Sequence, residues 1–88
     1  MVKRAGGALL LAISLDHASP RPISTQLYVA LRELMLSGRI AAKARLPASR
    51  ALARDLGVSR TTVIEAFERL AAEGLVESRV GAGTFVSE

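Results

Sequence analysis

Residues 46–63 read Leu-Pro-Ala-Ser-Arg-Ala-Leu-Ala-Arg-Asp-Leu-Gly-Val-Ser-Arg-Thr-Thr-Val, and this stretch decides the fold. Ser49 and Ser59 each stand at the start of an apolar-periodic run, where a serine hydroxyl can accept from a free backbone N–H and cap a helix. Gly57 lies between the two runs and tolerates the backbone angles of a sharp turn. The stretch therefore predicts two short helices, over 49–56 and 60–73.

The spacing within this stretch indicates how the two helices pack. Ala53 is small enough to let the second helix approach, Gly57 makes the turn, and Val63 closes the contact. This arrangement suits a helix-turn-helix, in which two helices cross steeply through a short connection. The expected inward residues are Leu52, Ala53 and Leu56 on the first helix, and Val63, Phe67, Leu70 and Ala71 on the second.

A third helix is predicted upstream, over 22–37. Apolar residues recur at helical spacing from Ile23 to Leu34, and Pro22 suits a first helical turn because its missing N–H needs no partner there. Gly38 ends the helix in a left-handed conformation. Residues 39–47 form a loop that turns Ile40 and Leu46 into the core.

The C-terminal part predicts a β-hairpin. Gly74 stops the preceding helix, and the β-prone runs 75–80 and 84–87 flank Gly81-Ala82-Gly83. This loop lacks the third glycine and the following helix of a phosphate-binding loop, which argues against a nucleotide site. The predicted fold is mainly α with a small β-hairpin: a winged helix-turn-helix of three helices plus a wing over 22–88. An extended N-terminal lead-in over 1–21 precedes it.

Composition narrows the function classes. The 88 residues form one small domain and contain no cysteine, which excludes disulfides and thiolate metal sites. The formal net charge of +4 permits nucleic acid or an anionic membrane surface as a partner. Residues 45–63 contain four arginines and one acidic residue, whereas glutamates dominate over 64–79. The four arginines are Arg45, Arg50, Arg54 and Arg60. Two ordinary solvated faces would give the same pattern.

The first residues superficially resemble a secretory signal. Met1-Val-Lys-Arg precedes an apolar run over 5–15, but the run is too short to span a bilayer. Asp16 and His17 interrupt the place where a cleavage site is expected. The better interpretation is a lead-in that packs as an edge strand or stays loose, in a cytoplasmic protein without a membrane partner.

The candidate binding residues cluster at the helix starts and at the hairpin. The first turn of the second helix of a helix-turn-helix reaches base edges in the major groove, and an arginine there can contact guanine. Arginine gains nothing from the dipole at a helix N-terminus, so an anionic partner explains it better. The predicted DNA-binding residues are Ser49, Arg50, Ser59, Arg60, Thr61, Thr62, Arg79, Gly81 and Gly83, with Arg45 and Arg54 as lesser candidates.

The two alternative functions are a protein-interaction module and an enzyme. A winged helix can bind an acidic protein instead of DNA, and exposed Leu11, Ile13 and Leu15 would then be suspected. An enzyme finds no support, because His17 is the only histidine and is best explained as a solvated loop residue. The scattered carboxylates do not suggest a metal site.

The chain resembles the GntR family of bacterial transcription regulators. The resemblance rests on Leu46-Pro-Ala-Ser-Arg, Leu56-Gly-Val-Ser-Arg-Thr-Thr-Val, Leu70-Ala-Ala-Glu-Gly-Leu-Val and Gly81-Ala-Gly-Thr-Phe-Val, and residues 59–70 look most like the MocR branch. It implies that Arg50, Arg60, Thr61, Thr62 and the wing glycines contact double-stranded operator DNA.

In that branch the DNA-binding domain is followed by a large domain that resembles an aminotransferase and binds pyridoxal phosphate. The resemblance implies that this cofactor and the main contacts of a homodimer would belong to such a C-terminal domain, so no cofactor is expected in this chain. Ala44 stands where the family often has glycine, and Ile64 stands where some relatives carry a further basic contact.

Overall fold

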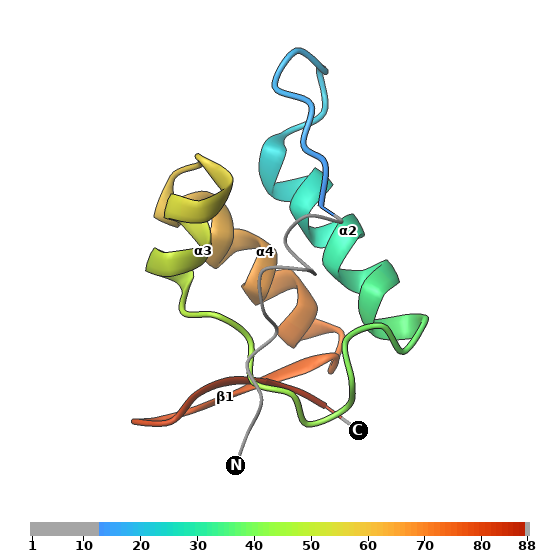
Figure 1. Ribbon diagram of the computed structural model, residues 1–88, viewed down its shortest axis with the longest axis vertical. Helices are drawn as coiled ribbons and strands as arrows, with labels where there is room; N and C mark the ends of the chain where they lie inside the picture. Colours follow the sequence, from blue (N-terminus) through green and yellow to red (C-terminus); the bar gives the residue numbers. More distant parts are fainter. Residues whose placement is uncertain (1–12, 88) are drawn as a thin grey trace.

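The computed structural model describes residues 13–87, and it has the expected architecture. Within these residues, three helices precede a two-stranded antiparallel hairpin (Figure 1). The elements are α2 (Ile23–Leu36), α3 (Ser49–Leu56), α4 (Arg60–Ala72), β1 (Val76–Arg79) and β2 (Gly83–Val86). Helix α4 packs against α2, α3 and β1, so it is the central element. The mainly α winged helix-turn-helix is confirmed, with helix ends within one residue of the predicted ones.

The start of α4 is capped as predicted. The Ser59 hydroxyl accepts from the backbone N–H of Thr62 at 3.1 Å. The corresponding prediction for Ser49 is wrong, because Ala48 is the N-cap residue and no side chain caps α3. The backbone of Ala48 is extended (φ −60°, ψ 147°), so the helix begins at Ser49 itself. Pro22 likewise lies just before α2 as its N-cap, not in its first turn.

This difference between the two serines gives a stability prediction. Ser59→Ala should lower the free energy of unfolding by about 1 kcal/mol, because it leaves a backbone donor of α4 without its cap. Ser49→Ala should change it by much less, since that hydroxyl caps no helix. Urea denaturation of both variants measures the difference, and equal losses would show that the Ser59 cap does not stabilise the fold.

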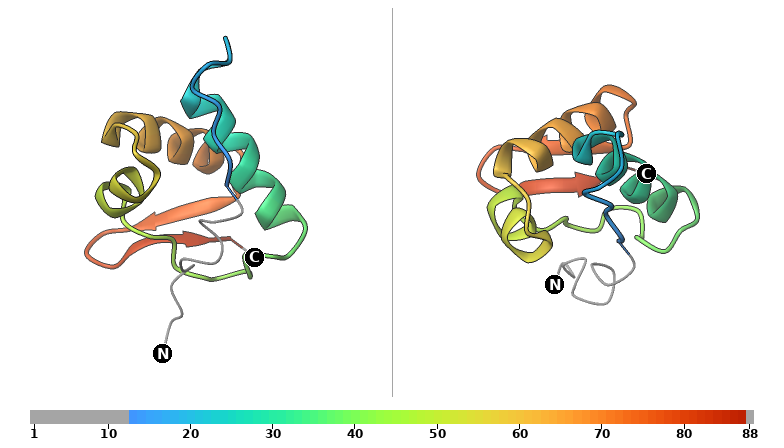
Figure 2. Two further views of the ribbon diagram at one scale, coloured as in Figure 1. Left: turned by 45° about the horizontal axis from the view of Figure 1, so that its top comes forward. Right: turned by 90° about the horizontal axis from the view of Figure 1, so that it is seen from above.

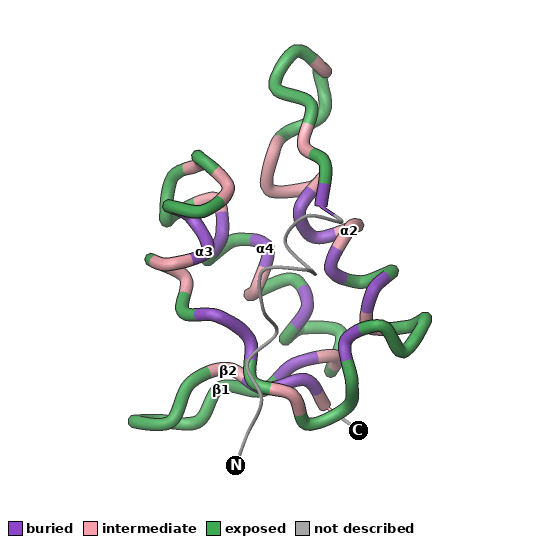
Figure 3. The backbone as a smooth tube through the Cα atoms, viewed as in Figure 1, coloured by how far each residue is buried: buried purple, intermediate pink, exposed green. Residues whose placement is uncertain are grey.

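The core lies between the three helices and the hairpin, and Figure 3 shows buried segments in each of these elements. Its largest fully buried side chains are Leu27, Leu52, Val63 and Leu70. Ile40 and Leu46 are buried as predicted. Ala71 was predicted to face inward but is exposed, and Ala66 is buried instead. Residues 63, 66 and 70 lie on one face of the helix. Residue 71 is rotated about 100° from residue 70 around the helix axis, so its side chain lies off that face.

The turn between α3 and α4 depends on Gly57, whose φ is +69°. Its left-handed backbone lets the Val58 N–H donate to Ala53 O at 3.0 Å and directs the chain into α4. Val58 is half-buried and packs against the core. Gly57 therefore sets the angle between the two helices.

Residues 43–46, predicted as loop, lie alongside β2 as a short third segment of the wing. The Lys43 N–H donates to Val86 O and the Leu46 N–H to Thr84 O, both at 2.8 Å. The Val86 N–H donates back to Ala44 O at 2.9 Å. The chain between α2 and α3 therefore anchors the wing to the helical body.

The described part of the lead-in is irregular and tied to α2. Ile13 belongs to the core, so the expectation that it is exposed is wrong. Leu15 is half-buried, and Leu11 lies outside the described residues. The Gln26 side chain holds this segment: its Oε1 accepts from Asp16 N at 2.8 Å and its Nε2 donates to Asp16 O at 3.0 Å. Residues 13–21 form no strand.

A polar cluster joins α2 to the end of α4. The Tyr28 hydroxyl donates to Glu73, Arg32 Nε donates to the other Glu73 oxygen at 3.3 Å, and the Arg69 guanidinium lies 4.0 Å above the Tyr28 ring. The Tyr28 hydrogen bond, with help from Arg32, lowers the pKa of Glu73 below its usual value. The same bond raises the pKa of Tyr28.

The lowered pKa of Glu73 predicts a pH dependence of stability. Since the unfolded chain binds this proton at higher pH than the folded chain, the stabilisation is complete above the ordinary value of 4.5. It is lost as the pH falls through the folded value. Glu73→Gln should therefore flatten the acid limb of a plot of unfolding free energy against pH. An unchanged acid limb would contradict the assignment.

Candidate nucleic-acid interface

One edge of the molecule brings together α3, the beginning of α4 and the tip of the wing. The three elements lie at the same edge in every orientation (Figures 1 and 2). Helix α3 crosses α4 close to the start of α4, and the wing loop projects beyond the sheet toward the same side. This edge contains the helix starts and the glycine turn that the sequence predicted to bind DNA.

The first turn of α4 presents its polar side chains outward. Arg60 and Thr61 are exposed, and Thr62 is half-buried with its hydroxyl 2.9 Å from that of Ser59. Arg60 Nε donates to the Ser49 hydroxyl at 3.3 Å. Ser49 therefore orients Arg60 from the start of α3, a role that sequence reasoning missed because it assigned that hydroxyl to a cap.

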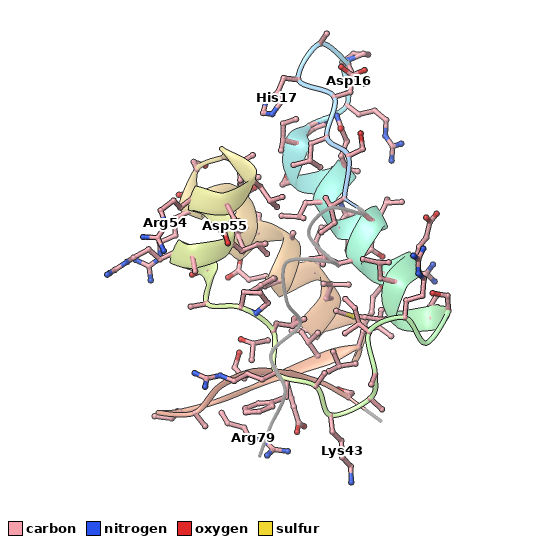
Figure 4. The ribbon with its side chains drawn as sticks, in the orientation of Figure 1. Asp16, His17, Lys43, Arg54, Asp55 and Arg79 are labelled. Carbon is pink, nitrogen blue, oxygen red and sulfur yellow. The ribbon has the colours of Figure 1, made fainter. Side chains whose placement is uncertain are left out.

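The arginines of this edge are not neutralised within residues 13–87. Arg50, Arg54 and Arg60 are exposed, and none forms an ion pair in that part of the chain. Figure 4 shows Arg54 projecting outward from α3. Arg50 and Arg60 lie in the first turns of α3 and α4, and Arg54 lies in the last turn of α3. Three guanidiniums without an ion pair among residues 13–87 create a positive potential suited to a polyanion.

The wing contributes exposed backbone to this edge, but not Arg79, the one wing side chain that the sequence predicted to bind DNA. Gly81 (φ +77°) and Gly83 (φ +118°) are exposed and adopt angles that favour glycine. Arg79 is paired: its Nη2 donates to Glu77 Oε1 at 2.8 Å, and its guanidinium lies 4.9 Å from the Phe85 ring centre. In Figure 4, Arg79 lies below the hairpin, on the side away from α3. Its charge is therefore less available than that of the helix arginines.

Residues 13–87 show neither a metal site nor a membrane-spanning helix. No three metal-ligating side chains gather there, and His17 lines a shallow depression with Gly57, Ser59 and Thr62. No helix in this range is long and apolar enough to cross a bilayer.

The sequence matches the family model described as "Bacterial regulatory proteins, gntR family" over residues 23–86. It is 49% identical over 73 residues to the probable rhizopine catabolism regulatory protein MocR of Rhizobium meliloti. It is 39% identical over 77 residues to the pyridoxine biosynthesis transcriptional regulator PdxR of Corynebacterium glutamicum. These matches cover 83% and 88% of the chain but only 15% of MocR and 17% of PdxR.

Solved structures agree with the sequence relatives. YtrA from Sulfolobus acidocaldarius, a GntR-family transcription factor, superposes with a TM-score of 0.82 at 31% identity, over 88% of this chain and 81% of that one. The structure of AraR(DBD) in complex with operator ORX1 superposes with a TM-score of 0.76 at 28% identity, over 85% and 96%. With the family model matching most of its length, the chain belongs to the gntR family of bacterial regulatory proteins, and its sequence resembles the MocR-like branch.

Proposed function

We propose that this chain is the sequence-specific DNA-binding part of a bacterial transcription regulator. The observation that carries the proposal is the Arg60 guanidinium at the exposed first turn of α4, which donates to the Ser49 hydroxyl and has no ion pair among residues 13–87. The similarity to AraR(DBD), whose structure includes an operator, supports the same role. The role is one of binding and not of catalysis, in the cytoplasm, and it requires no cofactor in this chain.

Each element of the interface has a distinct task in this proposal. Helix α4 enters the major groove, where Arg60 donates two hydrogen bonds to a guanine. Thr61 and Thr62 contact a phosphate or a thymine methyl, and Arg50 contacts the backbone from α3. Gly81 and Gly83 let the wing backbone approach the duplex closely.

The proposal is tested by selecting bound sequences from a random pool of double-stranded DNA. We expect enrichment of a short motif, arranged as two half-sites if the protein binds as a homodimer. Recovery of DNA without a common motif would contradict specific recognition. No recovery of DNA, together with binding to an acidic protein, would favour a protein-interaction module instead.

The exposed arginines of α3 and α4 also predict a strong salt dependence of DNA binding. If four to six phosphates are neutralised, the logarithm of affinity should fall against the logarithm of salt concentration with a slope of roughly −4 to −5. Fluorescence anisotropy with the selected duplex, between low and physiological salt, measures the slope. A slope near zero would mean that Arg50, Arg54 and Arg60 do not contact the phosphate backbone.

A further inference from the structure

Arg45 belongs to the wing, although the sequence places it in the connection between α2 and α3. It pairs with Phe85 of β2 in an isolated antiparallel bridge. The flanking hydrogen bonds of Lys43 and Leu46 to β2, both 2.8 Å, fix that register. The backbone of Arg45 is therefore held to the wing by the same kind of bonds that join β1 to β2.

The Arg45 side chain lies against Gly83, where the wing turn meets β2. A Cβ atom at Gly83 would stand 2.9 Å from Arg45 Nε, 3.5 Å from Nη2 and 3.6 Å from Cζ. Only the first of these distances is an outright clash, and it involves the guanidinium itself. The bare Cα of Gly83 thus provides the space that the Arg45 guanidinium occupies, one residue from the exposed turn over 80–82.

The two arginines of the wing differ in the availability of their charge. Arg79 donates through Nε and Nη2 to Glu77 and covers the Phe85 ring. Arg45 is exposed and forms no ion pair within residues 13–87. Arg45 is therefore the wing arginine whose positive charge is open to an anionic ligand.

We propose that Arg45 enters the DNA minor groove beside the Gly81–Gly83 turn and gives the operator site a preference for A·T pairs there. The inference rests on the proposed function and assigns a specificity role to a residue outside α4. Narrow A·T-rich minor grooves carry an enhanced negative potential that attracts inserted arginine. Arg45 lies against the glycine turn without an ion pair among residues 13–87, so it suits that groove better than Arg79, which is paired with Glu77.

The test uses the 88-residue chain and the selected operator, with the base pairs under the wing changed from A·T to G·C. For the wild-type chain, we expect this change to weaken binding roughly tenfold. For Arg45→Gln, the affinity for the A·T operator should fall by a similar factor, and the G·C change should then have little further effect. The matched control, Arg79→Gln, should retain the tenfold A·T preference.

Several results would overturn the inference. The A·T preference could survive in Arg45→Gln, it could disappear in Arg79→Gln, or the wild-type chain could show no A·T preference. Urea denaturation of Arg45→Gln and Arg79→Gln shows whether the wing remains folded. Arg45→Lys is a second test of the role of Arg45, because it keeps the positive charge but lacks the planar guanidinium. Failure of the wild-type chain to bind any operator would instead refute the proposed function.

Discussion

Replacing Arg60 with alanine is expected to weaken operator binding by about 1–3 kcal/mol, and to do so at one base position above all. The Arg60 guanidinium is exposed, has no ion-pair partner in the described chain and is oriented by the Ser49 hydroxyl 3.3 Å away. A bidentate contact with guanine O6 and N7 uses the planar group that alanine lacks. Binding titrations against operators varied at each position measure both the loss and the relaxed preference.

The controls separate base recognition from charge and from folding. Arg60→Lys should retain part of the affinity but little of the guanine preference, because an ammonium group cannot form the planar pair of bonds. Ser49→Ala should give a smaller loss in the same direction, since it only frees Arg60. Arg60→Ala that binds every operator variant as the wild-type chain does would refute the recognition role of α4.

The largest effect on stability is expected from Leu70→Ala. Leu70 is fully buried on α4, the helix that packs against α2, α3 and β1. Removing its side chain should cost about 2–5 kcal/mol, which includes the cavity left behind. The free energy of unfolding of a domain of this size is roughly 4–13 kcal/mol, so the variant should lose a large share of its stability.

Ile64→Ala is the matched control for that experiment. Ile64 lies on the same helix but is 36% exposed, so its truncation should change the unfolding free energy by less than about 1 kcal/mol. Thermal and urea denaturation followed by circular dichroism measure both variants. Equal losses for the two residues would mean that the core is not centred on the buried stripe of α4.

Most of the fold follows from local signals in the sequence. Periodic apolar residues, Gly57 and the Ser59 cap place α3 and α4 almost to the residue, because each acts within one turn of chain. Ala66 and Ala71 were confused because alanine carries little hydrophobic signal, and only the angle at which α4 crosses its neighbours separates them. The third wing segment was missed because its hydrogen bonds join residues about 40 positions apart.

The candidate site also contains features that local sequence predicts and features that depend on the folded chain. Arg60 and Arg50 are recognisable from sequence because position within a helix start determines what faces outward. Whether a charge is paired cannot be predicted in the same way. Arg79 is paired with Glu77, whereas Arg45 lies against Gly83 and has no ion pair in the part of the chain that the structure describes. That distinction depends on strand register and side-chain direction, which only the folded chain supplies.

The central claim, that α4 lies in the major groove with Arg60 on a guanine, is tested most directly by methylation protection of the bound operator. Dimethyl sulfate attacks guanine N7 in the major groove, the atom that an arginine contact covers. We expect the wild-type chain to protect one guanine in each half-site, and Arg60→Ala to leave that guanine reactive while bound at higher protein concentration. A protection pattern identical for the two proteins would contradict the claim.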